Sequence, residues 1–200
     1  GLGWLLFLLN QPYWLDTFPV DFKMPEAHLF FSALTFPHVA LGTALILAIF
    51  WLILKTADRR PPTGANSRNV WWYAIGTGLV NLALAIVYPF LVYLTAVTIG
   101  IYWVYLVARS RRILWRQSFL WAITFLIPAP LLLYYANTLA TNPVLRAWDA
   151  QAITPSPPLP HYLVAYGVML LLGLLLFKQR SSEFAFLWVW VAAAALLVYV

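Results

Sequence analysis

The chain has 200 residues, of which 64% are hydrophobic and only 9% are charged. Soluble domains carry about 25% charged residues, and a globule of this length cannot bury so much apolar surface, so a water-soluble fold is excluded. The composition predicts an all-α, polytopic transmembrane helix bundle that uses lipid as its solvent. The chain has no cysteine, which excludes disulfides and thiolate metal sites.

A helix needs about 20 apolar residues to cross a bilayer. The chain begins and ends inside apolar runs, so we expect a single transmembrane domain that is a fragment of a longer membrane protein. It should have six to seven spans, the first of them truncated. The predicted spans cover residues 1–9, 37–54, 70–88, 90–108, 117–135, 161–177 and 183–200.

Prolines set several of these boundaries. Pro37 suits the first position of a helix, which leaves 25–35 as a separate interfacial helix on the outer side. Pro89 interrupts an apolar stretch that is too long for one helix, so we expect two spans joined by a tight hairpin. Pro128 and Pro130 predict a kink in the next span.

The basic residues indicate which side of the membrane is cytoplasmic. Ten of the twelve Lys and Arg residues lie in loops 55–69, 109–116 and 178–183. With a break at Pro89, all three loops fall on one side, as the positive-inside rule requires of a plasma membrane protein, bacterial in our interpretation. The net charge of +6 is therefore a topology signal, and we expect the lipid bilayer, and no nucleic acid, as the partner.

The opposite side carries most of the other polar groups, including four of the six acidic residues and all three histidines. We expect the working face there, because function usually lies on elaborated loops over a rigid scaffold. The first outer loop holds the group Asp16, Asp21, Glu26 and His28. A carboxylate near a histidine can serve as a general base or bind a metal. No pair has a diagnostic metal spacing, so the alternative is a solvated loop.

Two further positions suit a phosphorylated or sugar ligand. His38 follows Pro37 in the first turn of a span, where free N–H groups favour a phosphate; a histidine at headgroup depth is the alternative. The stretch "NPVLRAWDAQAITPSPPLPHYLVAYG" (142–167) has five prolines, which predict a partly extended loop. Arg146 is the only arginine on this side and would pair with an anion. The residues suited to a sugar ring and its hydroxyls are Trp148, Asp149, Gln151 and His161. The alternative is a stiff loop with an interfacial Trp.

These motifs resemble those of GT-C-type glycosyltransferases from prokaryotes. The similar features are Glu26 with Phe30, Phe31 and "FPH" (36–38), the "VYPF" that ends a span (87–90), and the late outer loop, together covering about 26–167. Tyr88 stands where the family has a histidine. The resemblance implies transfer of a sugar from a polyprenyl-phosphate donor on the non-cytoplasmic face.

The resemblance also implies a catalytic base in the first outer loop. The candidates are Asp16, Asp21 and Glu26, or a carboxylate preceding Gly1. His38 and Arg146 would contact the donor phosphate. The cofactor is left open, with a divalent metal as one option. The sequence does not specify the sugar, the acceptor or the oligomeric state.

Other classes remain as alternatives. A transporter would place ionisable groups at the midplane, whereas here Asn81 is almost the only polar side chain deep in a span, where it predicts an interhelical hydrogen bond. A non-catalytic membrane subunit or scaffold is also compatible with the sequence. A two-haem protein would need histidines paired across spans, but all three histidines lie on one side.

Overall fold

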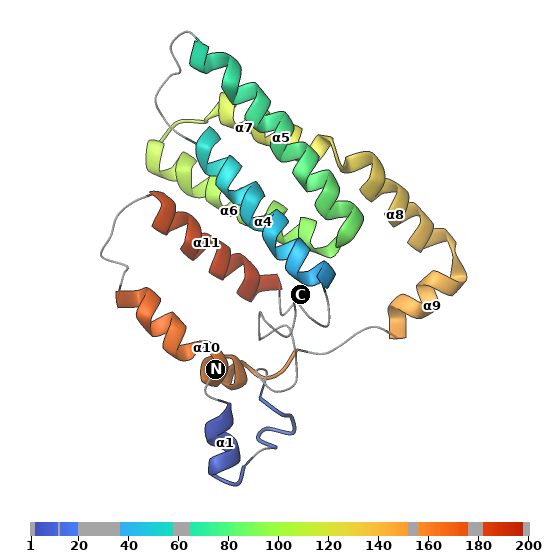
Figure 1. Ribbon diagram of the computed structural model, residues 1–200, viewed down its shortest axis with the longest axis vertical. Helices are drawn as coiled ribbons and strands as arrows, with labels where there is room; N and C mark the ends of the chain where they lie inside the picture. The colour runs from blue at the N-terminus through green and yellow to red at the C-terminus, as the bar shows by residue number, and fades with distance from the viewer. Residues whose placement is uncertain are drawn as a thin grey trace. The chain divides into compact units, whose positions relative to one another are not determined.

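The computed structural model describes residues 3–11, 13–19, 37–57, 65–151, 156–175 and 182–197. Over these residues the chain is helical, with one isolated bridge and no strand, which confirms the all-α prediction (Figure 1). The helices are α1 (Trp4–Leu8), α4 (Pro37–Thr56), α5 (Ala65–Val87), α6 (Phe90–Ser110), α7 (Trp115–Leu126), α8 (Ala129–Thr141), α9 (Pro143–Gln151), α10 (Leu159–Leu175) and α11 (Ser182–Leu197).

The chain divides into two compact units. The first comprises mainly Gly1–Ala40 and Thr154–Ala185, and the second mainly Leu41–Ile153 and Phe186–Val198. In the described residues, the first unit contains α1, a tight turn and α10. The second unit contains most of α4, all of α5 to α9, and most of α11.

Several helices are long and apolar enough to cross a bilayer, so the chain is an integral membrane protein. Three meet this condition by themselves, namely α4, the part of α5 from Val70 to Val87, and α6. The bent pair α7 and α8 makes a fourth if it is one span. With 17 residues in α10 and 16 in α11, the six to seven predicted spans are not confirmed.

The prolines act where the sequence predicts. Pro37 is the first residue of α4. The chain breaks at Tyr88–Pro89, between the end of α5 and the start of α6. The axes of α7 and α8 differ by 49°, and Pro128 lies at this bend. A proline ring cannot donate to the carbonyl four residues earlier and clashes with it, which explains both breaks.

The stretch 142–167, for which the prolines predicted a partly extended loop, begins with a helix. Helix α8 continues to Thr141 and α9 follows after one residue. The Asn142 side-chain oxygen accepts hydrogen bonds from the N–H groups of Val144 (2.9 Å) and Leu145 (3.3 Å). Pro143 occupies the first helical position, where its missing N–H costs nothing. The proline therefore starts a helix here.

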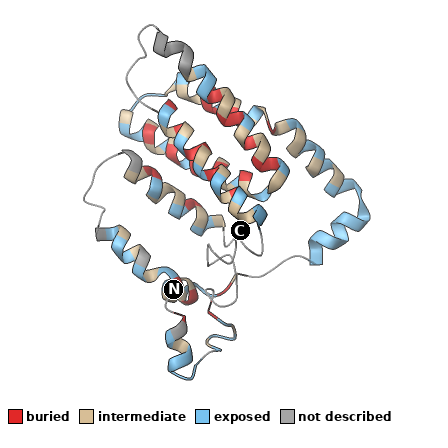
Figure 2. Cartoon of the chain, in the orientation of Figure 1, coloured by how far each residue is buried: buried red, intermediate tan, exposed pale blue. Residues whose placement is uncertain are grey.

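The core of the second unit lies along the inner faces of α4, α5, α6, α7 and α11 (Figure 2). Phe50, Tyr102 and Phe186 form its aromatic centre, with ring centroids 4.9 Å apart for both Phe50–Phe186 and Tyr102–Phe186. Gly78 allows α5 to approach α7 closely, because a Cβ there would overlap the Ile127 side chain. Small residues commonly permit such approaches between membrane helices.

Two long-range hydrogen bonds join helices inside this core. The Asn81 amide on α5 donates to the Thr124 carbonyl on α7 over 3.1 Å, which confirms the predicted interhelical bond. The Trp121 indole N–H donates to the Thr56 hydroxyl at the end of α4 over 2.9 Å. Both bonds are buried, where an unpaired polar group would be costly.

Candidate functional site

The predicted site residues fall into three groups in the structure. Asp16, His38 and His161 belong to the first unit. The second unit holds Arg146, Trp148, Asp149 and Gln151, all on α9. Asp21, Glu26, His28 and the predicted interfacial helix 25–35 lie outside the described residues.

Asp16 lies in a two-residue hairpin turn. Trp14 and Thr17 form an antiparallel bridge, and the Thr17 N–H donates to the Trp14 carbonyl over 3.3 Å. Leu15 and Asp16 have φ values of 51° and 60°, the left-handed pair that characterises a type I′ turn. The Asp16 carboxylate is exposed at the tip of this turn, so it is accessible to a ligand or to water.

His161 anchors this turn to the first turn of α10. Its side chain is fully buried, and its Nε2 donates to the Trp14 carbonyl over 2.7 Å. The imidazole also packs on the Trp14 ring, with centroids 5.3 Å apart. Nδ1 has no hydrogen-bond partner among the described residues. A buried histidine bonded to a backbone carbonyl stabilises the fold, and this geometry gives no support to a direct sugar contact.

The first unit therefore places the Asp16 turn beside the start of α10, although the two are distant in sequence. Only tertiary packing brings them together. His38 is exposed in the first turn of α4, the environment in which a phosphate is favoured by helix N–H groups.

Helix α9 is an exposed amphipathic helix at the end of α8. Val144, Leu145 and Trp148 share one face by their helical spacing and are 73%, 37% and 65% exposed. Arg146 and Asp149 lie off this face, and a guanidinium N–H of Arg146 donates to the Ala140 carbonyl in the last turn of α8. Arg146 as a whole is exposed.

An uncovered apolar face beside a charged face is typical of a helix that lies in the membrane interface. The sequence reasoning missed α9 because it gave the prolines too much weight. The Asn142-Pro143 pair, followed by apolar residues at helical spacing, was the signal that identified it.

A metal site is not assembled by the part of the chain that the structure describes, since no three His, Asp or Glu side chains converge there. Comparison with family models, with curated proteins and with solved structures finds no match to this chain.

Proposed function

We propose that the chain is the membrane-embedded part of a GT-C-type glycosyltransferase, which transfers a sugar from a polyprenyl-phosphate donor on the non-cytoplasmic face. The observation that carries the proposal is α9, a short exposed helix that bears a cation, an aromatic ring and two polar side chains suited to sugar hydroxyls. A polyprenyl phosphate has its headgroup at that depth and its tail in lipid, so its donor site needs this combination.

The position of α9 along the chain supports the outer location. Helix α7 begins at Trp115, within the arginine-rich segment 109–116, and the helical residues 115–141 together extend roughly 40 Å along their axes at about 1.5 Å per residue. This path exceeds the hydrocarbon core of about 30 Å, even with the bend between α7 and α8. Because the arginines favour the cytoplasmic side, α9 belongs at the opposite surface, in a bacterial plasma membrane on our proposal.

The proposed roles follow from the chemistry of each group. Arg146 pairs with the donor phosphate, and His38 is a second candidate for the same contact. Trp148 stacks on the sugar ring, while Asp149 and Gln151 bind its hydroxyl groups. The base that deprotonates the acceptor is Asp16, Asp21, Glu26 or a carboxylate outside this sequence. The polyprenyl phosphate is the leaving group when the new glycosidic bond forms.

Binding of polyprenyl monophosphate to the full chain in lipid nanodiscs tests this proposal. We expect Arg146→Gln to weaken binding about tenfold, because charged hydrogen bonds contribute about 1.5–3 kcal/mol. The matched control is Arg180→Gln, which removes the same charge from a predicted cytoplasmic loop and should leave the affinity unchanged. Equal affinity of wild type, Arg146→Gln and His38→Gln, or no binding by wild type, would overturn the proposal.

A transfer assay with the sugar-loaded donor then identifies the base. Among Asp16→Asn, Asp21→Asn and Glu26→Gln, the variant of the true base should lose transfer and keep donor binding. A chain that binds the donor but transfers no sugar would instead fit a non-catalytic donor-binding subunit.

A further inference from the structure

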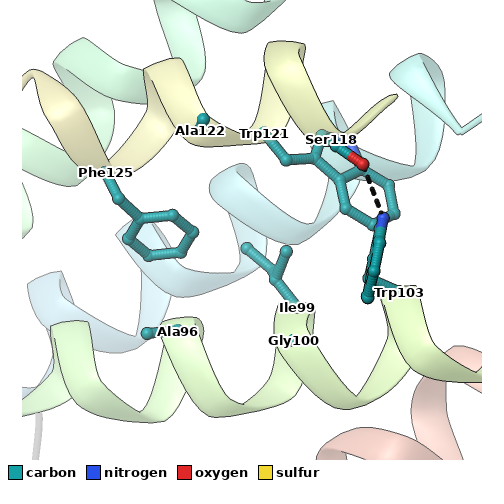
Figure 3. Close-up of a pocket in the computed structure, with 8 residues that line it drawn as sticks. All are labelled: Ala96, Ile99, Gly100, Trp103, Ser118, Trp121, Ala122 and Phe125. Atoms are coloured by element: carbon teal, nitrogen blue, oxygen red, sulfur yellow. Dashed lines mark hydrogen bonds between the residues drawn. The ribbon is translucent and has the colours of Figure 1, made fainter. Parts of the chain in front are cut away.

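Helices α6 and α7 enclose an apolar groove of about 340 Å³ in the second unit. Its walls are Ala96, Ile99, Gly100, Trp103, Ser118, Trp121, Ala122 and Phe125. Ala96 and Phe125 lie at one end, Trp103 and Ser118 lie at the other, and Ile99 lies between them (Figure 3).

The groove offers carbon surface and no free indole donor. The Trp103 N–H donates to the Ser118 hydroxyl over 2.9 Å, and this hydroxyl donates to the Leu114 carbonyl over 3.0 Å. The Trp121 N–H is bonded to Thr56. A polar ligand would find few partners here, so the occupant must be apolar.

The size of the groove favours a single hydrocarbon chain. Residues 96–103 of α6 extend about 10 Å. A hydrocarbon chain is much thinner than a helix, whose diameter is about 10 Å, and so suits a groove of this volume. Gly100 and Ala122 are both exposed, and a Cβ on Gly100 would meet nothing within 4 Å. The groove is therefore open to a chain that enters from the side.

The end with Trp103 and Ser118 leads directly to a cluster of positive charge. The segment 109–116 comprises the end of α6, the turn 111–114 and the start of α7; it contains Arg109, Arg111, Arg112 and Arg116 but no Asp or Glu. Arg111, Arg112 and Arg116 are exposed, and Arg109 donates to the Tyr105 hydroxyl over 2.7 Å. These arginines would attract an anionic group at the membrane surface, beside the end of the apolar groove.

We propose that the groove between α6 and α7 binds one acyl chain of an anionic glycerophospholipid, whose phosphate is held by the arginines of segment 109–116. The lipid comes from the leaflet on the side of the basic loops. The site is thus distinct from the donor site at α9 and does not depend on the proposed transferase activity.

Native mass spectrometry of the full chain, titrated with phosphatidylglycerol or phosphatidylcholine of identical acyl chains, tests the headgroup contact. We expect phosphatidylglycerol to bind more tightly, with a loss of about fivefold for each of Arg112→Gln and Arg116→Gln. Arg180→Gln, in another predicted cytoplasmic loop, should have no effect. Equal affinities of wild type for the two lipids would overturn the role of the arginines.

Filling the groove tests the chain contact. Gly100→Leu should weaken binding of both lipids by at least about tenfold, because several buried methylenes are lost. The control is Gly76→Leu on α5, since Gly76 also has nothing within 4 Å of an added Cβ and does not line the groove. If Gly100→Leu fails to fold, Ala122→Leu fills the groove from the α7 side, where Ala122 is exposed.

A photoactivatable phosphatidylglycerol with the reactive group in its acyl chain provides an independent readout on the unmodified protein. Crosslinks should fall within residues 96–103 and 118–125. Labelling spread evenly over the other apolar helices, or unchanged affinity in both groove-filling variants, would overturn the proposal.

Discussion

At the scale of single residues, the Asn81 side chain supplies a hydrogen bond that a proline removes from the neighbouring helix. In a regular helix the Thr124 carbonyl would accept the N–H of residue 128, but that residue is proline and has no N–H. The Asn81 amide donates to this carbonyl from α5. The kink at Pro128 and the polar residue deep in the neighbouring helix are therefore parts of one arrangement.

We expect Asn81→Ala to lower the free energy of unfolding by about 1 kcal/mol, in the range of interhelical hydrogen bonds in membrane proteins. In a Pro128→Ala background the same change should cost less than half as much, because residue 128 then supplies the missing donor. Thermal unfolding in detergent measures both values. Asn137→Ala, an exposed position on α8, is the control, and equal costs in the two backgrounds would refute the coupling.

Asp16 has a structural role that is separable from catalysis. Its φ of 60° disfavours most residues with a Cβ, by about 1–2 kcal/mol, so Asp16→Ala should destabilise the turn while Asp16→Gly should preserve it. Hydrogen exchange of residues 13–19 measures this difference. If Asp16 is the base, both variants lose transfer. Transfer that survives in Asp16→Gly would exclude Asp16 as the base.

At the scale of helices, the packing of α5 on α7 depends on which glycine faces the neighbour. A Cβ at Gly78 would lie 3.2 Å from the Ile123 carbonyl oxygen and overlap Ile127, whereas a Cβ at Gly76 meets nothing within 4 Å. These two glycines are only two residues apart in the same helix but lie on nearly opposite faces of it, about 200° apart, and thus form a matched pair.

Gly78→Ala is expected to destabilise the second unit by about 1–3 kcal/mol, because a backbone carbonyl cannot move aside as a flexible side chain can. Gly76→Ala should leave stability unchanged or raise it by up to about 1 kcal/mol through helix propensity. Thermal unfolding compares the melting temperatures of the two variants. Similar values would mean that the helices do not approach closely at Gly78.

At the scale of the whole molecule, the distribution of charge predicts which ends of the helices share a side of the membrane. The chain has no cysteine, so each introduced cysteine reports on one position. Ile113 in the basic turn and Ala150 on α9 are both exposed and suit such labelling.

An impermeant maleimide added to intact cells should label Ala150→Cys and leave Ile113→Cys unlabelled until the membrane is permeabilised. The cysteine-free parent controls for background reaction. Labelling of both positions in intact cells would contradict the proposed orientation, and with it the outer location of the α9 site.

The sequence by itself determined the solvent, the helical class and the breaks at Pro89 and Pro128. Lipid demands long apolar runs and internally paired backbone groups, and both requirements are local properties of the chain. The number of spans was not determined in this way, because α10 and α11 are apolar but shorter than a bilayer span. Helix α9 was also encoded locally, by its cap at Asn142, and was missed only because prolines can start helices as well as interrupt them.

Only the tertiary structure decided what the polar side chains contact. His161 meets the Trp14 carbonyl across 147 positions, and Asn81 meets the Thr124 carbonyl across 43. The groove between α6 and α7 likewise is lined by residues from 96–103 and from 118–125, which lie on different helices. No window of sequence contains both partners of such contacts. Their pairing follows from how whole helices pack, and that packing separated a structural histidine from candidates for chemistry.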